Sequence, residues 1–173
     1  QWLGLGRSDR LENPGEYEVF ELCGKALVLI RNQDKELKLY ANTCRHRGAK
    51  LLDGTGQCQA ISCPFHGWTY SLDGNLKHAK TMAENPSFNF EEHSLIEYKL
   101  KELQGFLFVF LGNKPSDLSS QLGNFSELHQ PWSMNELVTT RRATFEVQCN
   151  WKAFLDVFNE YYHLNNVHPT SID

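Results

Sequence analysis

The sequence predicts a mainly β fold, in which an antiparallel β-sheet domain carries two ligand-bearing loops and is followed by a short α+β segment. Short apolar or alternating runs, separated by Gly, Pro, Asn and Asp, recur as far as residue 110 and indicate strands. The loops Cys44-Arg45-His46 and Cys63-Pro64-Phe65-His66 each place a cysteine close to a histidine. Beyond residue 137 the pattern changes, and residues 151–163 carry apolar side chains at helical spacing.

Length and charge limit the fold and the function. The 173 residues suit one ordinary domain and the beginning of a second, and we expect domains at 1–113 and 138–173 with a linker at 114–137. A net charge of -4 without a basic run argues against nucleic-acid binding. No apolar stretch is long enough for a membrane span and no signal-peptide pattern is present, so we expect no membrane association.

The elements follow in order. Residues 1–10 are expected to form an arm or short helix packed by Trp2. Asp73-Gly74 is a hairpin turn signal, and residues 51–56 read as a loop. The predicted strands span 16–20, 26–31, 37–40, 60–62, 68–72, 75–76, 95–103 and 106–110.

The end of the chain reads differently. Residues 112–131 are rich in Gly, Ser, Asn and Pro and predict a boundary. Residues 138–149 predict a strand that begins something new, and residues 151–163 predict a helix.

The two loops carry the clearest chemical signal. Sixteen residues, Arg47 to Ser62, separate them. Two thiolates and two imidazoles can hold a zinc ion or an iron–sulfur cluster. Zinc patterns keep like ligands together as C-x2–4-C and H-x3–5-H, whereas here each loop mixes one Cys with one His. That mixture favours a two-iron cluster with differently ligated irons, and a Cys2His2 zinc site is the alternative.

These loops and their flanks, Asn42 to Ala49 and Cys63 to Tyr70, resemble the Rieske motif C-x-H-x(15–17)-C-x-x-H of Rieske non-heme iron oxygenases. The resemblance implies a Rieske-type β domain whose [2Fe-2S] cluster is held by Cys44, His46, Cys63 and His66. We interpret Trp68 and Tyr70 either as shields of the cluster or as core aromatics, with neither interpretation preferred.

A second group of polar residues lies near the end. His163 and His168 are five apart, so they can meet at one ion only if the helix ends between them, where Asn165-Asn166 gives it a place to end. Alone, this spacing is more typical of two unrelated surface histidines. However, Asn150-Trp151-Lys152 and the later Glu-x-Tyr-His-x(4)-His resemble the start of the catalytic domain of Rieske oxygenases.

That resemblance implies that His163 and His168 are two ligands of a mononuclear Fe(II). It also makes Glu160 the acidic residue that bridges to a cluster histidine of a neighbouring subunit. Glu at this position is similar to members that act on quaternary ammonium compounds such as carnitine or choline. The family's third, carboxylate ligand lies further downstream, and nothing places Asp156 or Asp173 in that role.

The resemblance implies electron transfer through a Rieske cluster to a mononuclear Fe(II), within an oxygenase that hydroxylates an aromatic ring or an alkyl-ammonium compound. We expect this chain to match only the front part of the α subunit, so that alone it is not catalytically complete. The implied partners are an electron-donating reductase or ferredoxin, O2 and a small organic substrate, in a homotrimer of the bacterial cytoplasm. The alternatives are a stand-alone Rieske ferredoxin and a zinc-stabilised binding module.

Overall fold

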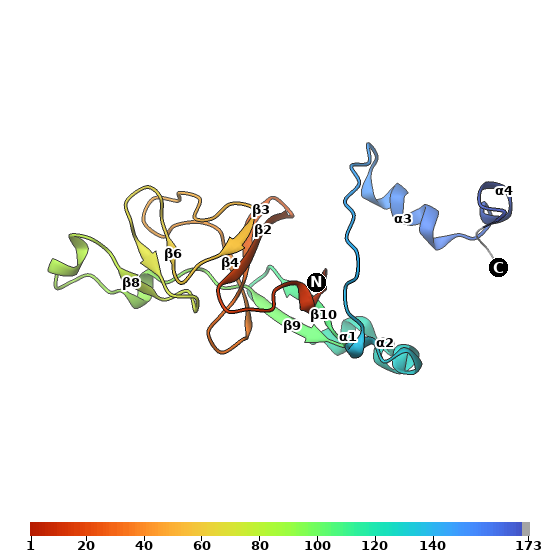
Figure 1. The fold of residues 1–173 in the computed structure, drawn as a ribbon, viewed down its shortest axis with the longest axis horizontal. Coiled ribbons are helices and arrows are strands. Elements are labelled where there is room, and N and C mark those ends of the chain that lie inside the picture. The colour runs from red at the N-terminus through yellow and green to blue at the C-terminus, as the bar shows by residue number, and fades with distance from the viewer. Residues whose placement is uncertain (171–173) are drawn as a thin grey trace. The chain divides into compact units, whose positions relative to one another are not determined.

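The computed structural model describes residues 1–170, with Ala83 described by its backbone alone. The chain divides into two compact units, one spanning Gln1–Thr139 and the other beginning at Thr140 (Figure 1). The first unit is mainly β and the second contains helices, as the predicted fold class requires.

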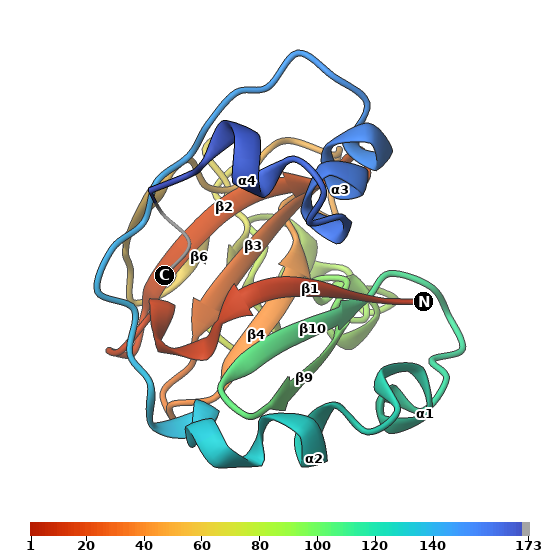
Figure 2. The same cartoon turned by 90° about the vertical axis from the view of Figure 1, so that its right-hand side faces the viewer.

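The strands of the described residues form three antiparallel sheets. Figure 2 shows most strands of the first two, and Figure 1 shows β6 and β8 of the third. The first has the order β1-β10-β9, with β1 at Trp2–Arg7, β10 at Phe106–Phe110 and β9 at Lys99–Leu103. The second has the order β4-β3-β2-β5, at Leu37–Ala41, Lys25–Arg31, Glu16–Leu22 and Thr55–Gln57. The third is β6-β7-β8, at Ile61–Ser62, Thr69–Tyr70 and Leu76–His78.

Strand β3 joins two hydrophobic cores. Leu27 and Leu29 pack with Leu107 of β10, whereas Val28 and Ile30 pack with the core beneath the two ligand loops. Because successive side chains of a strand point to opposite faces, a strand covered on both faces needs an unbroken apolar run. This explains why residues 26–30 do not alternate.

The predicted strands at 16–20, 26–31, 37–40 and 106–110 are confirmed with small shifts of their ends, as is the hairpin around Asp73-Gly74. Its turn is closed by a hydrogen bond from the Gly74 amide to the Ser71 carbonyl, and Gly74 has φ +77°. The segment expected to be a loop, 51–56, instead includes the start of β5, which pairs with β2.

The expectation of an arm or short helix at residues 1–10 is wrong. Residues 2–7 form β1, which pairs with β10 and carries an irregularity between Gly4 and Gly6. The short 3-10 helix Ser8–Arg10 follows. The two glycines hid the strand pattern, because glycine gives no apolar alternation. Trp2 is nevertheless buried, against Phe110 and Leu118.

Residues 114–137 contain two short helices, α1 at Leu118–Leu122 and α2 at Phe125–His129. The remaining 3-10 turns described are Met82–Glu84, Glu91–His93, Gln130–Trp132 and Met134–Glu136.

A pair of side chains from β1 and the following turn binds the last residues of the first unit. Arg7 donates hydrogen bonds to the carbonyls of Gln104, Met134 and Leu137. Asp9 accepts hydrogen bonds from the backbone amide and the hydroxyl of Thr139. We call this pair, Arg7 and Asp9, the exit clamp.

The second unit contains α3 at Trp151–Asn159 and α4 at Leu164–Val167. The Asn150 side chain caps α3 by accepting a hydrogen bond from the Lys152 amide. The helix ends at Asn159, earlier than the predicted 163, because Glu160 adopts an extended conformation with φ -118° and ψ 150°. The strand predicted at 138–149 is not formed, because no segment of residues 1–170 pairs with it and a strand needs a partner. None of the helices described in residues 1–170 combines the length and apolar character that crossing a bilayer requires.

Candidate functional site

The two ligand loops share one backbone hydrogen-bond pattern. In the first, the Cys44 amide donates to Ala49 at 2.8 Å and the Gly48 amide donates to Cys44 at 2.9 Å. In the second, Cys63 and Gly67 make the equivalent bonds, to Trp68 at 2.8 Å and to Cys63 at 3.0 Å. Gly48 and Gly67 have φ of +75° and +70°, a conformation that other residues adopt at a cost. Each loop therefore turns tightly around its cysteine and presents its histidine.

Of the four predicted cluster ligands, the two cysteines are more buried than the two histidines. Cys44 and Cys63 are 3% and 4% exposed and belong to one core cluster. His46 is half-buried and His66 is exposed. The two imidazole rings lie edge to face with their centroids 4.7 Å apart. The structure thus brings the two loops together, with the thiols inside and the imidazoles outside.

Tyr70, on β7, connects to the first loop. Its hydroxyl oxygen accepts a hydrogen bond from the Arg45 amide at 3.0 Å and lies 3.3 Å from Cys44 Sγ. Because the oxygen already accepts from Arg45, its own proton is free to point at the sulfur. Burial, and then the hydrogen bond with Cys44, raise the pKa of Tyr70, so the phenol stays protonated. Where Cys44 binds a metal as a thiolate, with no proton of its own, Tyr70 is the donor of this pair.

The chemistry of the donors fits an iron–sulfur cluster. Burial, followed by the nearby His66 and Arg47, lowers the pKa of His46 and favours the neutral imidazole that a metal requires. Nδ1 of His46 is buried and has no hydrogen-bond partner among the described residues. Two cysteine thiolates and two histidine imidazoles are the donor set of a Rieske centre.

The second group of predicted ligands lies after α3. His163 and His168 flank α4 as its N-cap and C-cap, with ring centroids 5.7 Å apart. A helix does end between the two histidines, as expected, because α4 stops at Val167 and His168 has left helical geometry; the chain also breaks earlier, at Glu160. Asn165 and Asn166 lie inside α4 instead of ending a helix.

Glu160 organises this turn. Its carboxylate accepts hydrogen bonds from the amides of Tyr162 and His163 and pairs with Nδ1 of the His163 ring. The His163 side chain, then these amides, lower the pKa of Glu160. Since Nδ1 is engaged, Nε2 is the nitrogen of His163 that remains to bind a metal.

The third ligand is not found among the described residues. No three His, Cys, Asp or Glu side chains of residues 1–170 form a site for a single metal ion. Asp156 lies within α3, and Asp173 lies outside the described residues.

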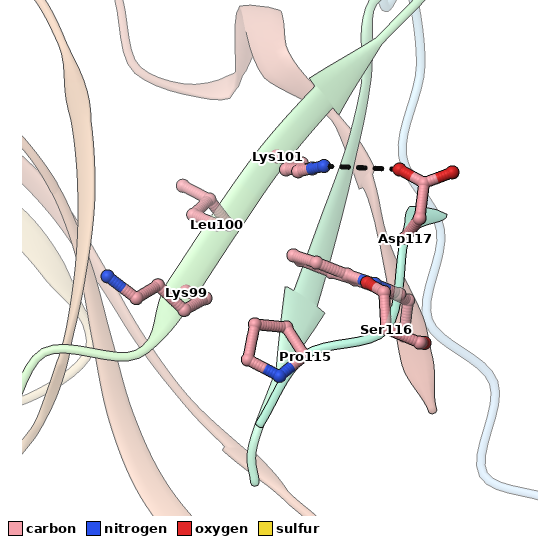
Figure 3. Close-up of a pocket in the computed structure, with 7 residues that line it drawn as sticks. Lys99, Leu100, Lys101, Pro115, Ser116 and Asp117 are labelled. Carbon is pink, nitrogen blue, oxygen red and sulfur yellow. Dashed lines mark hydrogen bonds and ion pairs between the residues drawn. The ribbon is translucent and has the colours of Figure 1, made fainter. Parts of the chain in front are cut away.

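A cavity of about 370 Å³ lies beside the β1-β10-β9 sheet, between Trp2, β9 and residues 115–117 (Figure 3). Lys101 stands over the Trp2 ring and pairs with Asp117 at 3.8 Å. None of the predicted ligands lines this cavity, so it is separate from the cluster loops.

The sequence predicted the two ligand loops, but not the aromatic side chains that pack near His46. Trp68 stacks on His46, with centroids 4.8 Å apart and planes 12° apart, and also makes edge contacts with Phe88 and His93. Phe88 and His93 come from a polar, irregular segment that gave no periodic signal. The W-x-Y pair after His66 was visible, but its spacing did not reveal which residue would contact a ligand.

Comparison with known proteins decides between a Rieske oxygenase, a stand-alone ferredoxin and a zinc-stabilised module. A family model described as the Rieske [2Fe-2S] domain matches residues 1–95, and one described as the ring hydroxylating alpha subunit (catalytic domain) matches residues 134–173. The chain belongs to the Rieske oxygenase family. The cluster is therefore a [2Fe-2S] centre rather than a zinc ion, and the second match sets the chain apart from a stand-alone ferredoxin.

Individual relatives agree. The carnitine monooxygenase oxygenase subunit of Acinetobacter baumannii is 34% identical over 99% of this chain and 47% of its own length. The glycine betaine monooxygenase oxygenase subunit of Chromohalobacter salexigens is 29% identical over 98% of this chain and 38% of its own length.

A solved structure of a quaternary ammonium Rieske monooxygenase, described for carnitine oxidation and inter-subunit electron transfer, superposes with a TM-score of 0.89. It is 33% identical and covers 98% of this chain and 47% of its own. The chain thus spans about half the length of the carnitine monooxygenase relatives.

Proposed function

We propose that this chain is the electron-transfer front part of an oxygenase α subunit, with a Rieske cluster in residues 1–113 and the beginning of a mononuclear iron site in residues 138–173. Residues 114–137 connect the two. A Rieske cluster supplies one-electron chemistry at a potential above that of four-cysteine ferredoxins. The observation that carries the proposal is the pair of loops with one hydrogen-bond pattern and one Cys and one His each.

Within this proposal Cys44 and Cys63 ligate one iron, and His46 and His66 ligate the other. The buried thiols keep the sulfur side of the site away from water, and Tyr70 donates a hydrogen bond to Cys44 Sγ. The exposed His66 leaves one edge of the site open to an electron partner. A reductase or ferredoxin supplies the electron.

The second site is proposed for the complete parent protein. His163 and His168 bind Fe(II), and Glu160 holds His163 with Nε2 toward the metal while serving as the bridge to a cluster histidine of a neighbouring subunit. A homotrimer in a bacterial cytoplasm, using O2, is the assembly we propose. The relatives named above come from bacteria, and the solved relative described for inter-subunit electron transfer supports an assembly of several subunits.

For the parent we propose a quaternary ammonium substrate in preference to an aromatic ring. The relatives named for carnitine and glycine betaine support this choice. The test is O2 uptake by the full-length parent with its reductase. L-carnitine or glycine betaine should stimulate uptake with stoichiometric product, and naphthalene should not. Stimulation by naphthalene alone would reverse the assignment.

The cluster itself can be tested on this chain. Iron, zinc and acid-labile sulfide are counted per chain after anaerobic purification, together with absorption and electron paramagnetic resonance (EPR) spectra. About two irons and about two sulfides are expected, with the spectrum of a Rieske centre. A His163→Ala/His168→Ala double variant is the control and should give the same counts. Zinc without sulfide would refute the proposal.

A further inference from the structure

Trp68 contacts both a proposed cluster ligand and a pair of further aromatic rings. Its indole is 3% exposed and stacks flat on the His46 ring. It also meets Phe88 and His93, each with ring centroids 5.6 Å away and planes near perpendicular, at 80° and 72°. The buried indole is thus in contact with three rings at once, one stacked and two edge-on.

The pair beyond Trp68 belongs to a structured segment, residues 85–93, which we call the aromatic cap. Phe88 and His93 stack on each other with centroids 4.5 Å apart. The Phe88 amide donates to the Asn85 carbonyl, and His93 Nδ1 lies 2.8 Å from the Asn89 carbonyl. The cap follows β8, at the end of the first unit that carries the third sheet (Figure 1). The rings of Phe88 and His93 therefore have defined positions.

The His46 ring is in contact with two other rings. Its Nδ1 has no hydrogen-bond partner among the described residues. Its ring contacts are the flat stack on Trp68 and the edge contact with His66. A metal-bound imidazole keeps one rotation free about its bond to the metal, and the groups packed on its faces determine that angle.

We propose that Phe88 and His93 are positioning residues. By packing against Trp68 they keep it stacked on His46, and this stacking restricts the orientation of the His46 imidazole. The inference rests on the proposed function, in which His46 ligates the cluster. Without the pair, Trp68 has room to tilt, water reaches the His46 face, and the angle between imidazole and iron becomes heterogeneous.

The test uses the cluster-loaded chain and the variants Phe88→Ala and His93→Ala, measured by EPR and by redox titration. Phe88→Tyr and His93→Phe keep an aromatic ring and serve as rescue variants. Phe90→Ala is the matched control, because Phe90 contacts Phe88 at 5.1 Å but makes no ring contact with Trp68 in the part of the chain described. Phe88→Leu replaces Phe88→Ala if the alanine variant does not fold.

We expect the alanine variants to bind unchanged iron and sulfide, with broadened and shifted g values, a shifted midpoint potential and several-fold faster loss of sulfide in air. The ring-keeping variants and Phe90→Ala should match the wild type in g values and potential. His93→Phe also removes the titratable group, so a shift equal to that of His93→Ala would overturn the inference. Unchanged g values in both alanine variants, or an equal change in Phe90→Ala, would overturn it too. A wild-type chain without a cluster would instead refute the proposed function.

Discussion

The two candidate sites of this chain are built in opposite ways. The cluster loops are short, closed by their own hydrogen bonds, and bring four donors together within 23 residues, Cys44 to His66. The second site offers two histidines and Glu160 on a short turn, after a helix with no buried residue in the structure. The loops thus bring all four donors of the first site together, whereas no third donor joins His163 and His168 among residues 1–170.

The largest effect should come from removing one ligand from each site. Cys63→Ser should abolish the bound iron and sulfide, because a serine hydroxyl does not replace a thiolate as a ligand here. His163→Ala should leave both counts unchanged. Metal and sulfide analysis with the visible spectrum measures this.

Cys149→Ser, at an exposed cysteine of the second unit, is the control and should behave as the wild type. Loss of the cluster in His163→Ala would mean that the two sites are not independent, and the comparison would fail.

A smaller effect is expected at the contact between the Tyr70 hydroxyl and Cys44 Sγ, a proposed cluster ligand. Tyr70→Phe removes the hydroxyl beside Cys44 Sγ, a donor that stabilises the more negative, reduced cluster. The midpoint potential should therefore fall, by tens of mV, since about 59 mV corresponds to a tenfold change for one electron. Redox titration followed by EPR measures the shift.

Tyr40→Phe is matched to it, because Tyr40 is equally buried but its hydroxyl donates to the Leu72 carbonyl instead of a cysteine. It should lower stability and leave the potential unchanged. An equal fall in both variants would assign the effect to packing.

The smallest effect concerns the exit clamp, at the end of the first unit. The Thr139 amide, with further help from its hydroxyl and Arg7, lowers the pKa of Asp9. A lowered carboxyl pKa means that the stabilisation is complete above about pH 4 and is lost as pH falls through the folded-state value.

Asp9→Ala should thus speed hydrogen exchange of the Thr139 amide above pH 4, by up to about fivefold for an ion pair and hydrogen bonds worth at most about 1 kcal/mol. The difference from wild type should vanish in more acid solution. Asp117→Ala, which removes the cap of α1, is the control and should not change this amide. A pH-independent difference would exclude the carboxylate as its cause.

The sequence predicted the features that are formed locally better than those that depend on long-range contacts. The ligand loops and most strands of the first unit are local patterns, so spacing and alternation were enough to predict them. Trp68, Phe88 and His93 meet across 20 to 25 residues, and such contacts depend on how the sheets pack. The prediction of a strand at 138–149 was wrong for a related reason. Alternation describes one strand and does not show whether a partner strand is present.

The pairing of β1 with β10 has a consequence for synthesis and folding. Trp2 is opposite Phe110, so the first sheet joins segments more than a hundred residues apart, while the hairpin of β7 and β8 joins neighbours. Long-range pairing carries the larger loop-closure entropy and slows folding. On the ribosome, β1 has no partner until residues 106–110 have emerged, by which time both ligand loops are already outside. Iron and sulfide can therefore meet their cysteines before the first sheet is finished.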